Sequence, residues 1–415
     1  MKSYDLIIIG GGAAGLLAAA SAIRAGKNVL LLEKNSKLGV KILMSGGSRC
    51  NITHACDSRD IVSAFGPKGK FLHSALASLS PNEVVELIES AGVATKVEVG
   101  GKIFPVSDKS IDVRDALVEL ANDPMAAGRS KILKSTACLK ISKLDAGFEV
   151  DTEQQTFHSK SVLITTGGKS YPGCGTTGDG YSWAKSLGHK IVQPVAALTP
   201  IKNLNSWTHG LKGISFEKVK LKIINGAGKK PLDQKNGSFL FTHFGFSGPS
   251  ALDISRTVSL AERPTELNLE CDFEPELNDG KLRNELTEML RLRSKQSLVS
   301  VLSGRYPRRF CELFLDAAKI DGRKKVAEVG KTSLNLLIEK LKRSQFPIQG
   351  VYGFKKAEVT AGGVSLSEID SRTMESKICP GLYFAGEVID LDGPIGGYNF
   401  QAAFSTGWLA GRNAG

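Results

Sequence analysis

The most constraining feature of the chain is a run of apolar residues that leads straight into a glycine-rich turn. Leu6 to Ile9 predict a buried parallel strand, and Gly10, Gly12 and Gly15 follow it in the spacing GxGxxG. In such a turn the first glycine makes the tight bend, the second lets the backbone approach a pyrophosphate, and the third lets the next helix pack closely on the strand. A helix over residues 13–25 would aim its free N–H groups and its positive dipole end at the phosphates.

An acidic residue stands at the end of the next predicted strand, which covers residues 29–33. Glu33 lies at the spacing of roughly 20 residues where a carboxylate accepts hydrogen bonds from both ribose hydroxyls of a dinucleotide. The same carboxylate repels a 2′-phosphate, so we expect a nucleotide other than NADP at this site. A glycine-rich turn in an ordinary α/β domain is the alternative, but strand, turn, helix, strand and acid together favour dinucleotide binding.

The length and composition of the chain limit its class. Its 415 residues exceed one typical core, so we expect two or three lobes. No apolar run approaches the roughly 18–20 residues that span a bilayer, and a first strand near Tyr4 leaves no room for a signal peptide, so we expect a cytoplasmic protein. The seven cysteines include no CxxC pair, which argues against a disulfide framework, a zinc site or a thioredoxin-reductase-type redox pair. We expect no metal.

Much of the net charge of +12 lies in one stretch of the chain. Residues 276–345 hold 16 Lys and Arg against 9 Asp and Glu, with short basic groups at 291–295, 305–309 and 323–325. A solvated helical surface is the simplest interpretation. Attraction of anionic substrates and loose association with nucleic acid are the alternatives, although no zinc-finger spacing or RNA-binding aromatic motif accompanies the charge.

Periodicity and turn signals predict the remaining elements. Ser80-Pro-Asn-Glu83 resembles a capping box and predicts a helix through residue 91. Short alternating segments predict a β-rich lobe over 194–271, and a helical pattern follows over 277–344. The other elements that we predict are helices over 111–121, 179–187 and 397–411, strands over 131–141 and 351–360, and a hairpin of 148–152 with 156–165 that returns to the sheet.

Three glycine-rich segments follow apolar strands, at 10–15, 167–168 and 386–397. A Rossmann-type NAD dehydrogenase needs only the first of them. FAD is a longer molecule, and its flavin end must be held by further parts of the fold. The three segments together therefore predict FAD as the cofactor.

Four segments carry a resemblance to a known family. They are residues 41–53 (KILMSGGSRCNIT), 166–180 (TGGKSYPGCGTTGDG), 240–248 (LFTHFGFSG) and 358–364 (EVTAGGV). With these segments the chain resembles, over nearly its whole length, the flavoprotein family that includes aminoacetone oxidase and a 3-dehydro-bile acid reductase, within the two-dinucleotide-binding-domain superfamily. Two positions depart from the pattern: Ser48 stands where the family usually has a third glycine, and Glu387 where the superfamily has Asp.

The resemblance implies FAD held without a covalent link and no separate second Rossmann domain for NAD(P)H. It implies that Glu387 lies near the ribityl chain and that the helix after Gly397 points at the N1–C2=O edge of the flavin. A positive helix end there favours the anionic reduced ring.

The fold class that we expect is α/β, with a Rossmann-like FAD-binding domain completed by both termini and an inserted β-barrel-like domain carrying a helical subdomain. The expected FAD-binding domain covers 1–195 and 358–415. Within the insert we expect a β-rich part over 196–275, a helical subdomain over 276–345 and a return strand over 346–357.

Several candidate residues have two interpretations. Arg49 pairs either with a phosphate or substrate carboxylate, or with an acid in a structural ion pair. Cys50 is a reactive thiol or, as we favour, a small buried hydrophobe. His243 is a proton donor above the ring or, as we favour, a histidine hydrogen-bonded within the insert. Tyr171 serves either catalysis or packing, and no catalytic residue is assigned. The cofactor-binding residues that we predict are Gly10, Gly12, Ala14, Gly15, Glu33, Lys34, Lys41, Ser45, Gly46, Arg49, Cys50, Asn51, Leu139, Thr166, Gly167, Gly386, Glu387, Gly397, Tyr398 and Asn399.

The function that we expect is that of an FAD-dependent oxidoreductase. It would transfer a hydride through flavin N5 to or from a small organic or sterol-like substrate, with NAD(P)H as a transient electron donor. An amine oxidase that passes electrons to oxygen and forms hydrogen peroxide is the first alternative. A non-enzymatic flavin-containing binding or regulatory protein with nucleic-acid affinity is the second. As partners we expect a small-molecule substrate and neither a membrane nor a nucleic acid.

Overall fold

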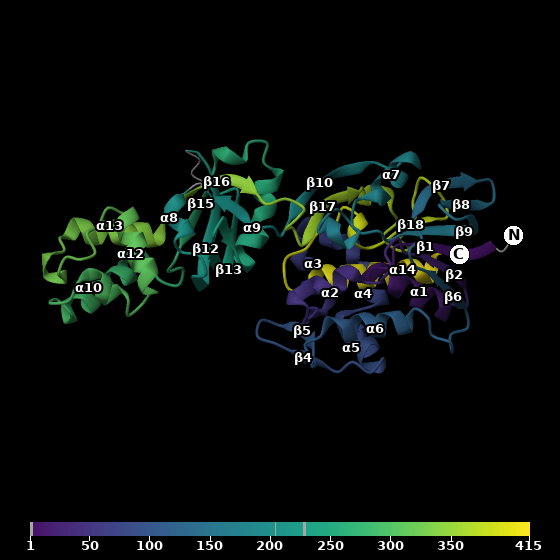
Figure 1. Cartoon of the computed structure of the whole chain (residues 1–415), viewed down its shortest axis with the longest axis horizontal. Helices are drawn as coiled ribbons and strands as arrows, with labels where there is room; N and C mark the ends of the chain where they lie inside the picture. Colours follow the sequence, from purple (N-terminus) through teal and green to yellow (C-terminus); the bar gives the residue numbers. More distant parts are fainter. Residues whose placement is uncertain (1–2, 204, 227–229) are drawn as a thin grey trace. The chain divides into compact units, whose positions relative to one another are not determined.

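The computed structural model describes residues 3–203, 205–226 and 230–415, and the chain divides into two compact units. Unit 1 combines residues 1–195 with residues 358–415, and unit 2 is formed by residues 196–357. The purple N-terminal strand and the yellow C-terminal helix in Figure 1 both belong to unit 1.

A largely parallel sheet forms the centre of unit 1. Strand β1 (Ser3–Ile9) lies between β2 (Asn28–Leu32) and β9 (Thr156–Ile164) and pairs with both in parallel. Strand β6 (Arg129–Leu133) follows β2, and β18 (Leu382–Phe384) adds to β9. The apolar residues predicted for the first strand are buried, as expected for a parallel strand covered on both faces. The predicted α/β fold class is confirmed.

The hairpin of β7 (Cys138–Leu144) and β8 (Gly147–Thr152) continues the sheet beyond β9. The single strand predicted over 131–141 is wrong, because β6 ends before this hairpin begins. Between them Ser135 takes a left-handed backbone with φ 52°, and Thr136 donates its N–H to the Glu33 carbonyl at 2.9 Å. These two features turn the chain out of the sheet.

The first and last helices of the chain pack backbone against backbone. In α14 (Tyr398–Asn413), a Cβ added at Gly407 would stand 2.3 Å from the Ala14 carbonyl oxygen of α1 (Ala13–Arg24). One turn further, a Cβ at Gly411 would stand 2.1 Å from the Ala18 carbonyl oxygen. Figure 1 shows the two helices side by side under the sheet. Glycines in α14 therefore bring the C-terminal segment of the chain against its N-terminal turn.

The other elements of unit 1 surround this pair. Helix α5 begins with the predicted capping box, in which Ser80 accepts from the Glu83 N–H at 3.3 Å and Glu83 accepts from the Ser80 N–H at 2.7 Å. No helix in the described part of the chain has the length and apolar character needed to cross a membrane. The remaining elements of unit 1 are α2 (Val40–Met44), β3 (Thr53–His54), α3 (Ser58–Ala64), α4 (His73–Ser78), α5 (Pro81–Ser90), β4 (Thr95–Val97), β5 (Lys102–Pro105), α6 (Ser110–Leu120), α7 (Asp179–Ser186), and the paired strands β10 (Ile191–Ala197) and β17 (Val359–Val364).

Unit 2 contains a closed antiparallel barrel. Its interior is filled by phenylalanines that have no exposed surface, among them Phe239, Phe241, Phe246 and Phe346. The aromatic rings of Phe239 and Phe241 meet edge to face with centroids 5.0 Å apart. The strands follow one another around the barrel as β11 (Ile201–Asn203), β14 (Gly245–Ser247), β13 (Asp233–Thr242), β12 (Ser215–Asn225), β15 (Leu267–Asp272) and β16 (Ser344–Val351).

Helices complete unit 2 and depart from the prediction in two places. An unpredicted helix, α9 (Pro249–Leu260), lies in the β-rich segment, where Pro249 begins it and Ala251, Ile254 and Val258 are buried. The strand predicted over 351–360 is wrong, because β16 ends at Val351 and a turn with Gly353 at φ 72° separates it from β17. The other helices of unit 2 are α8 (Ser206–His209), α10 (Asp279–Leu292), α11 (Leu298–Leu302), α12 (Arg308–Ala317) and α13 (Lys331–Lys342).

The packing of α1 on α14 predicts that Gly407→Ala lowers the stability of the protein, although this substitution usually raises the stability of a helix. Glycine to alanine inside a helix ordinarily stabilises by roughly 0.5–1 kcal/mol. At Gly407 the added methyl group meets a backbone oxygen, so we expect the free energy of unfolding to fall by at least about 2 kcal/mol. Gly280→Ala in α10 is the matched control, because its nearest atom is 3.5 Å away, and it should stabilise. Denaturant titration measures the change in the free energy of unfolding for both variants. Equal stabilisation by both would contradict the packing.

Candidate functional site

The glycines of the turn after β1 have two kinds of surroundings: some are packed against backbone atoms, and one faces open space. Gly10 has φ 110°, and a Cβ there would stand 2.7 Å from the Thr165 carbonyl oxygen. A Cβ at Gly15 would stand 1.9 Å from the Gly10 carbonyl oxygen. Gly12 differs, because a Cβ there meets nothing within 4 Å, and no side chain caps the N-terminus of α1. The turn thus leaves a surface of free N–H groups with room for a ligand beside Gly12.

Glu33 is buried at the end of β2, as the fingerprint predicts. Its Oε2 accepts the N–H of Gly11 at 2.8 Å, and its Oε1 accepts the N–H of Asn35 at 2.8 Å. The two bonds fix the carboxylate next to the glycine turn. Each oxygen keeps acceptor capacity for a hydroxyl group.

Two buried polar atoms in the predicted cofactor loops have no hydrogen-bond partner in the described part of the chain. They are Oγ1 of Thr166, which follows β9, and Oδ1 of Asn51, in the loop after α2. Buried oxygens without a partner cost free energy, so their presence in two predicted cofactor loops indicates groups that a ligand satisfies. These atoms and the open space at Gly12 fit a bound dinucleotide.

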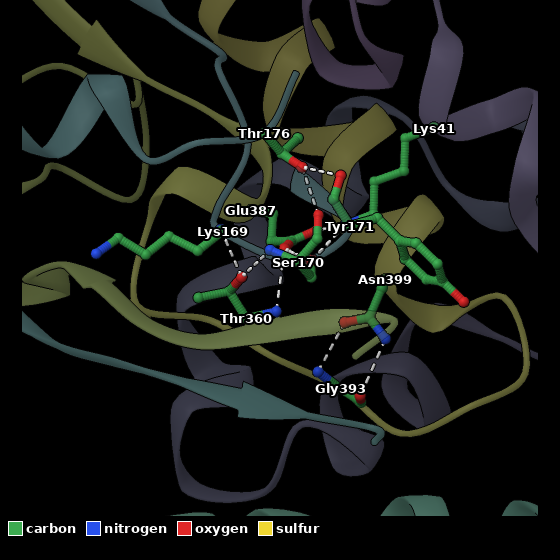
Figure 2. A network of polar contacts seen from close by, with 9 residues as sticks. All are labelled: Lys41, Lys169, Ser170, Tyr171, Thr176, Thr360, Glu387, Gly393 and Asn399. Atoms are coloured by element: carbon green, nitrogen blue, oxygen red, sulfur yellow. Dashed lines mark hydrogen bonds and ion pairs between the residues drawn. The ribbon is translucent and has the colours of Figure 1, made fainter. Parts of the chain in front are cut away.

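A network of polar contacts joins segments that are far apart in the chain (Figure 2). The Glu387 carboxylate accepts from Lys41 Nζ at 2.5 Å, from Ser170 Oγ at 2.6 Å and from the Thr360 N–H at 3.0 Å. Thr360 Oγ1 in turn accepts the N–H groups of Lys169 and Ser170, at 2.8 and 3.0 Å. Ser170 and Thr360 are fully buried. The predicted residues Lys41 and Glu387 are thus brought together and held in place by protein groups.

Ser170 and Thr360 were missed as functional candidates, although both lie in segments that carry the family resemblance. A Cβ added at Gly168 would stand 2.3 Å from Thr360 Oγ1 and 2.8 Å from Glu387 Oε1. Gly168 is therefore needed where these three segments meet. The glycine pair at 167–168 indicated a site in the sequence, but only the fold shows that the hydroxyls of Ser170 and Thr360 belong to it.

The N-terminus of α14 lies against the segment before α3. Gly397 has φ 97°, and a Cβ there would stand 2.6 Å from the Thr53 carbonyl carbon. Thr53 Oγ1 donates to the buried Gln401 side chain at 2.6 Å, which anchors the first turn of the helix. Asn399 bonds both backbone groups of Gly393, as Figure 2 shows, and Tyr398 stacks on His54 at 4.8 Å. The preceding loop is thereby fixed.

The loop from Ser45 to Asn51 contains two residues with positive φ and an arginine that is held in ion pairs. Ser48 and Cys50 both have positive φ, at 68° and 62°. The Arg49 guanidinium forms two bonds to Glu98, at 2.8 and 3.0 Å, and a third to Asp108 at 3.1 Å. The hydrogen bonds from Arg49 lower the pKa of Glu98. Burial raises the pKa of the Cys50 thiol to about 12, so this group is a neutral thiol at physiological pH.

The other predicted residues have varied surroundings. Lys34 forms an ion pair with Asp179 at 2.5 Å. Ala14 packs against Gly386, because a Cβ added at Gly386 would stand 2.8 Å from the Cβ of Ala14. Leu139 is exposed in β7, and its carbonyl accepts from the Trp183 indole at 3.2 Å. His243 is an exposed residue of unit 2, next to the Phe244 ring.

Tyr171 occupies the loop after Ser170 in a conformation that few residues adopt. Its φ is 53°, and the Thr176 hydroxyl donates to its carbonyl at 3.1 Å. In Figure 2 its ring points away from the Glu387 network. Its hydroxyl forms no hydrogen bond with the part of the chain that the structure describes. Burial raises the pKa of the Tyr171 phenol above its ordinary value.

A family model described as the HI0933-like protein Rossmann domain matches residues 4–413. The chain belongs to this family. It is 34% identical over 421 aligned positions to a ribosomal RNA dihydrouridine synthase of Escherichia coli, in an alignment covering 100% of this chain and 98% of the relative. It is also 31% identical to a 3-dehydro-bile acid delta(4,6)-reductase of Clostridium scindens, with 98% of both chains covered. The sequence-based recognition of the family is confirmed.

Solved structures show the same fold at low sequence identity. The 3-ketosteroid-delta4-(5alpha)-dehydrogenase of Rhodococcus jostii matches 99% of this chain and 96% of its own, with a TM-score of 0.51 and 16% identity. At that identity the likeness concerns the fold alone. The family and the relatives make the chain an FAD-dependent oxidoreductase of this HI0933-like group, and its cofactor is FAD, as the glycine segments predict.

The open space at Gly12 predicts a variant that folds but fails to hold FAD. Gly12→Val places its side chain where the backbone would approach the pyrophosphate, at a position where a Cβ meets nothing within 4 Å. We expect the affinity for FAD to fall at least about 100-fold, or roughly 2.7 kcal/mol, while the apoprotein unfolds as the parent does. Gly330→Val is the control, because its Cβ also meets nothing within 4 Å but lies in unit 2. FAD retention equal in both variants would place the pyrophosphate elsewhere.

Proposed function

We propose that FAD lies with its pyrophosphate on the glycine turn at 10–15 and its adenosine ribose on Glu33. The open space at Gly12 and the two backbone bonds that orient Glu33 support this placement. The ring end would lie between the N-terminus of α14 and the loop 45–51, where Asn51 Oδ1 has no hydrogen-bond partner among the described residues. Lys41 and Glu387 then belong to the wall that positions the middle of the cofactor, and Arg49 belongs to the loop that borders the ring.

The reaction that we propose is reduction of a carbon–carbon double bond conjugated to a carbonyl group. One observation carries this proposal: two whole-chain relatives with unlike substrates bear names that describe the same kind of bond change. Dihydrouridine formation saturates the C5=C6 bond of uracil, which is conjugated to C4=O. A delta(4,6)-reductase of a 3-oxo bile acid saturates double bonds conjugated to that ketone. Both names favour a reductase over an amine oxidase.

The bound cofactor would supply a hydride from N5 of its reduced ring to the carbon β to the carbonyl group. The free N–H groups of the first turn of α14 would place positive potential at the edge of the ring that carries the negative charge on reduction. The α carbon then needs a proton. Tyr171 Oη is a suitable donor, because the raised pKa keeps it protonated and it forms no hydrogen bond with a described residue.

The substrate class that we propose is uracil within ribosomal RNA. Relatives at 34% and 32% identity over nearly the whole chain carry the name of ribosomal RNA dihydrouridine synthase. The net charge of +12 also favours a polyanionic substrate. We further propose NAD(P)H as a transient electron donor, since both reactions need two electrons and a proton source.

The proposed function predicts a defined product. Holoenzyme with NADH or NADPH, incubated with unmodified ribosomal RNA transcripts, should yield dihydrouridine, detected by mass spectrometry as a nucleoside heavier by two hydrogens. Enzyme stripped of FAD is the control and should yield none. Hydrogen peroxide formed from an amine, with no change in RNA or in conjugated enones, would favour the amine oxidase instead.

The role of Tyr171 predicts a loss that is limited to the proton-transfer step. Tyr171→Phe should lower the rate of RNA reduction at least about 100-fold, while NAD(P)H still reduces the flavin at the parent rate. Because burial raises the Tyr171 pKa, the parent rate should stay level through neutral pH and fall only in the alkaline range. Tyr4→Phe, on β1, removes a hydroxyl elsewhere in unit 1 and should change neither rate. An unchanged RNA reduction rate in Tyr171→Phe would exclude this donor.

A further inference from the structure

Unit 2 carries a cluster of exposed cations that form no ion pair with the residues that the structure describes. Two segments, residues 293–299 and 322–327, run side by side at the ends of α10 and α12. The Leu298 and Val299 N–H groups donate to the carbonyls of Lys324 and Gly322, at 3.0 and 2.9 Å. In the other direction, Val326 donates to Gln296 at 2.9 Å. The backbone pairing therefore gathers the cations of both segments in one place.

We call the five exposed basic side chains of these segments the basic patch, which consists of Arg293, Lys295, Arg323, Lys324 and Lys325. None of the five forms an ion pair within the part of the chain that the structure describes. Some other cations of the same helical part are held in ion pairs. Arg305 pairs with Glu274 and Glu285, and Lys342 pairs with Asp272 at 2.6 Å.

The frame beneath the patch is rigid. Leu298 and Val326 are buried in the core of unit 2. Gly322 is buried as well, and a Cβ there would stand 2.5 Å from the Val299 side chain. The Asp321 carboxylate accepts the Arg323 N–H at 3.0 Å and so fixes the turn. The patch is therefore a set of exposed side chains on a backbone that buried residues anchor, which suits contact with successive phosphates.

From this geometry we infer that the basic patch is a docking surface for the sugar–phosphate backbone of structured RNA. The inference rests on the proposed function, because it assigns to unit 2 the holding of the RNA whose uracil is reduced at the flavin. The five unpaired cations supply affinity without base reading, since phosphate contacts carry no sequence information. The helices that border the patch, α10, α12 and α13, appear in green in Figure 1.

Charge reversal tests the patch. The variant R323E/K324E/K325E should bind ribosomal RNA transcripts at least about 10-fold more weakly at low salt, and the negative slope of log affinity against log salt should become shallower by about 2–3. The control K131E/K185E/K190E makes the same change of charge on exposed lysines of unit 1 and should keep the parent slope. R323Q/K324Q/K325Q provides a milder variant if the reversal impairs folding. Filter binding of the holoenzymes measures all of them.

The outcomes separate the patch from the function. Reduction of the flavin by NAD(P)H should be equal in all variants, because it needs no RNA. Parent enzyme that forms dihydrouridine, together with a patch variant of unchanged RNA affinity and slope, would overturn the patch and leave the proposed function standing. Parent enzyme that binds RNA through the patch but forms no dihydrouridine would overturn the proposed function. Loss of binding to anionic vesicles without loss of RNA binding would assign the patch to a membrane surface and overturn the inference.

Discussion

The close approach of α1 and α14 is the interaction on which the site of unit 1 depends. Gly407 and Gly411 let the last helix lie with its backbone on that of Ala14 and Ala18. Because Gly407 packs on Ala14 and Gly411 on Ala18, the two helices are parallel, and the N-terminus of α14 lies roughly 12 Å beyond that of α1 with its free N–H groups pointing the same way. Two positive helix ends are thus supplied by opposite ends of the sequence.

The same constraint explains why the polar network lies where it does. Gly386 packs on Ala14, so the carboxylate of the next residue, Glu387, is fixed relative to α1. Lys41 and Ser170 meet this carboxylate, and Thr360 orders the loop that carries Ser170. A cofactor with a pyrophosphate on α1 and a ring toward α14 fits between these supports.

The sequence predicted well what is decided within a few neighbouring residues. The strand and turn from Leu6 to Gly15 and the capping box at Ser80 depend on local spacing, and the structure contains both. The break at Ser135 was missed, because a positive φ in a polar stretch of otherwise strand-like residues leaves no pattern. The partners of Glu387 were missed as well, since Lys41 and Ser170 lie 346 and 217 positions away, Thr360 lies 27 positions away, and contacts at such separations have no local signal. The roles of the individual cofactor-binding residues remain predictions.

The proposed chemistry is tested most directly by the oxidation of the reduced flavin. Holoenzyme reduced with dithionite is mixed, without oxygen, with unmodified ribosomal RNA in a stopped-flow instrument. A reductase of conjugated uracil should regain its oxidised flavin absorbance in a phase whose rate rises with RNA concentration, and RNA that the enzyme has already reduced should produce no such phase. A reduced flavin that ignores RNA and conjugated enones but is rapidly oxidised by oxygen would contradict the proposal.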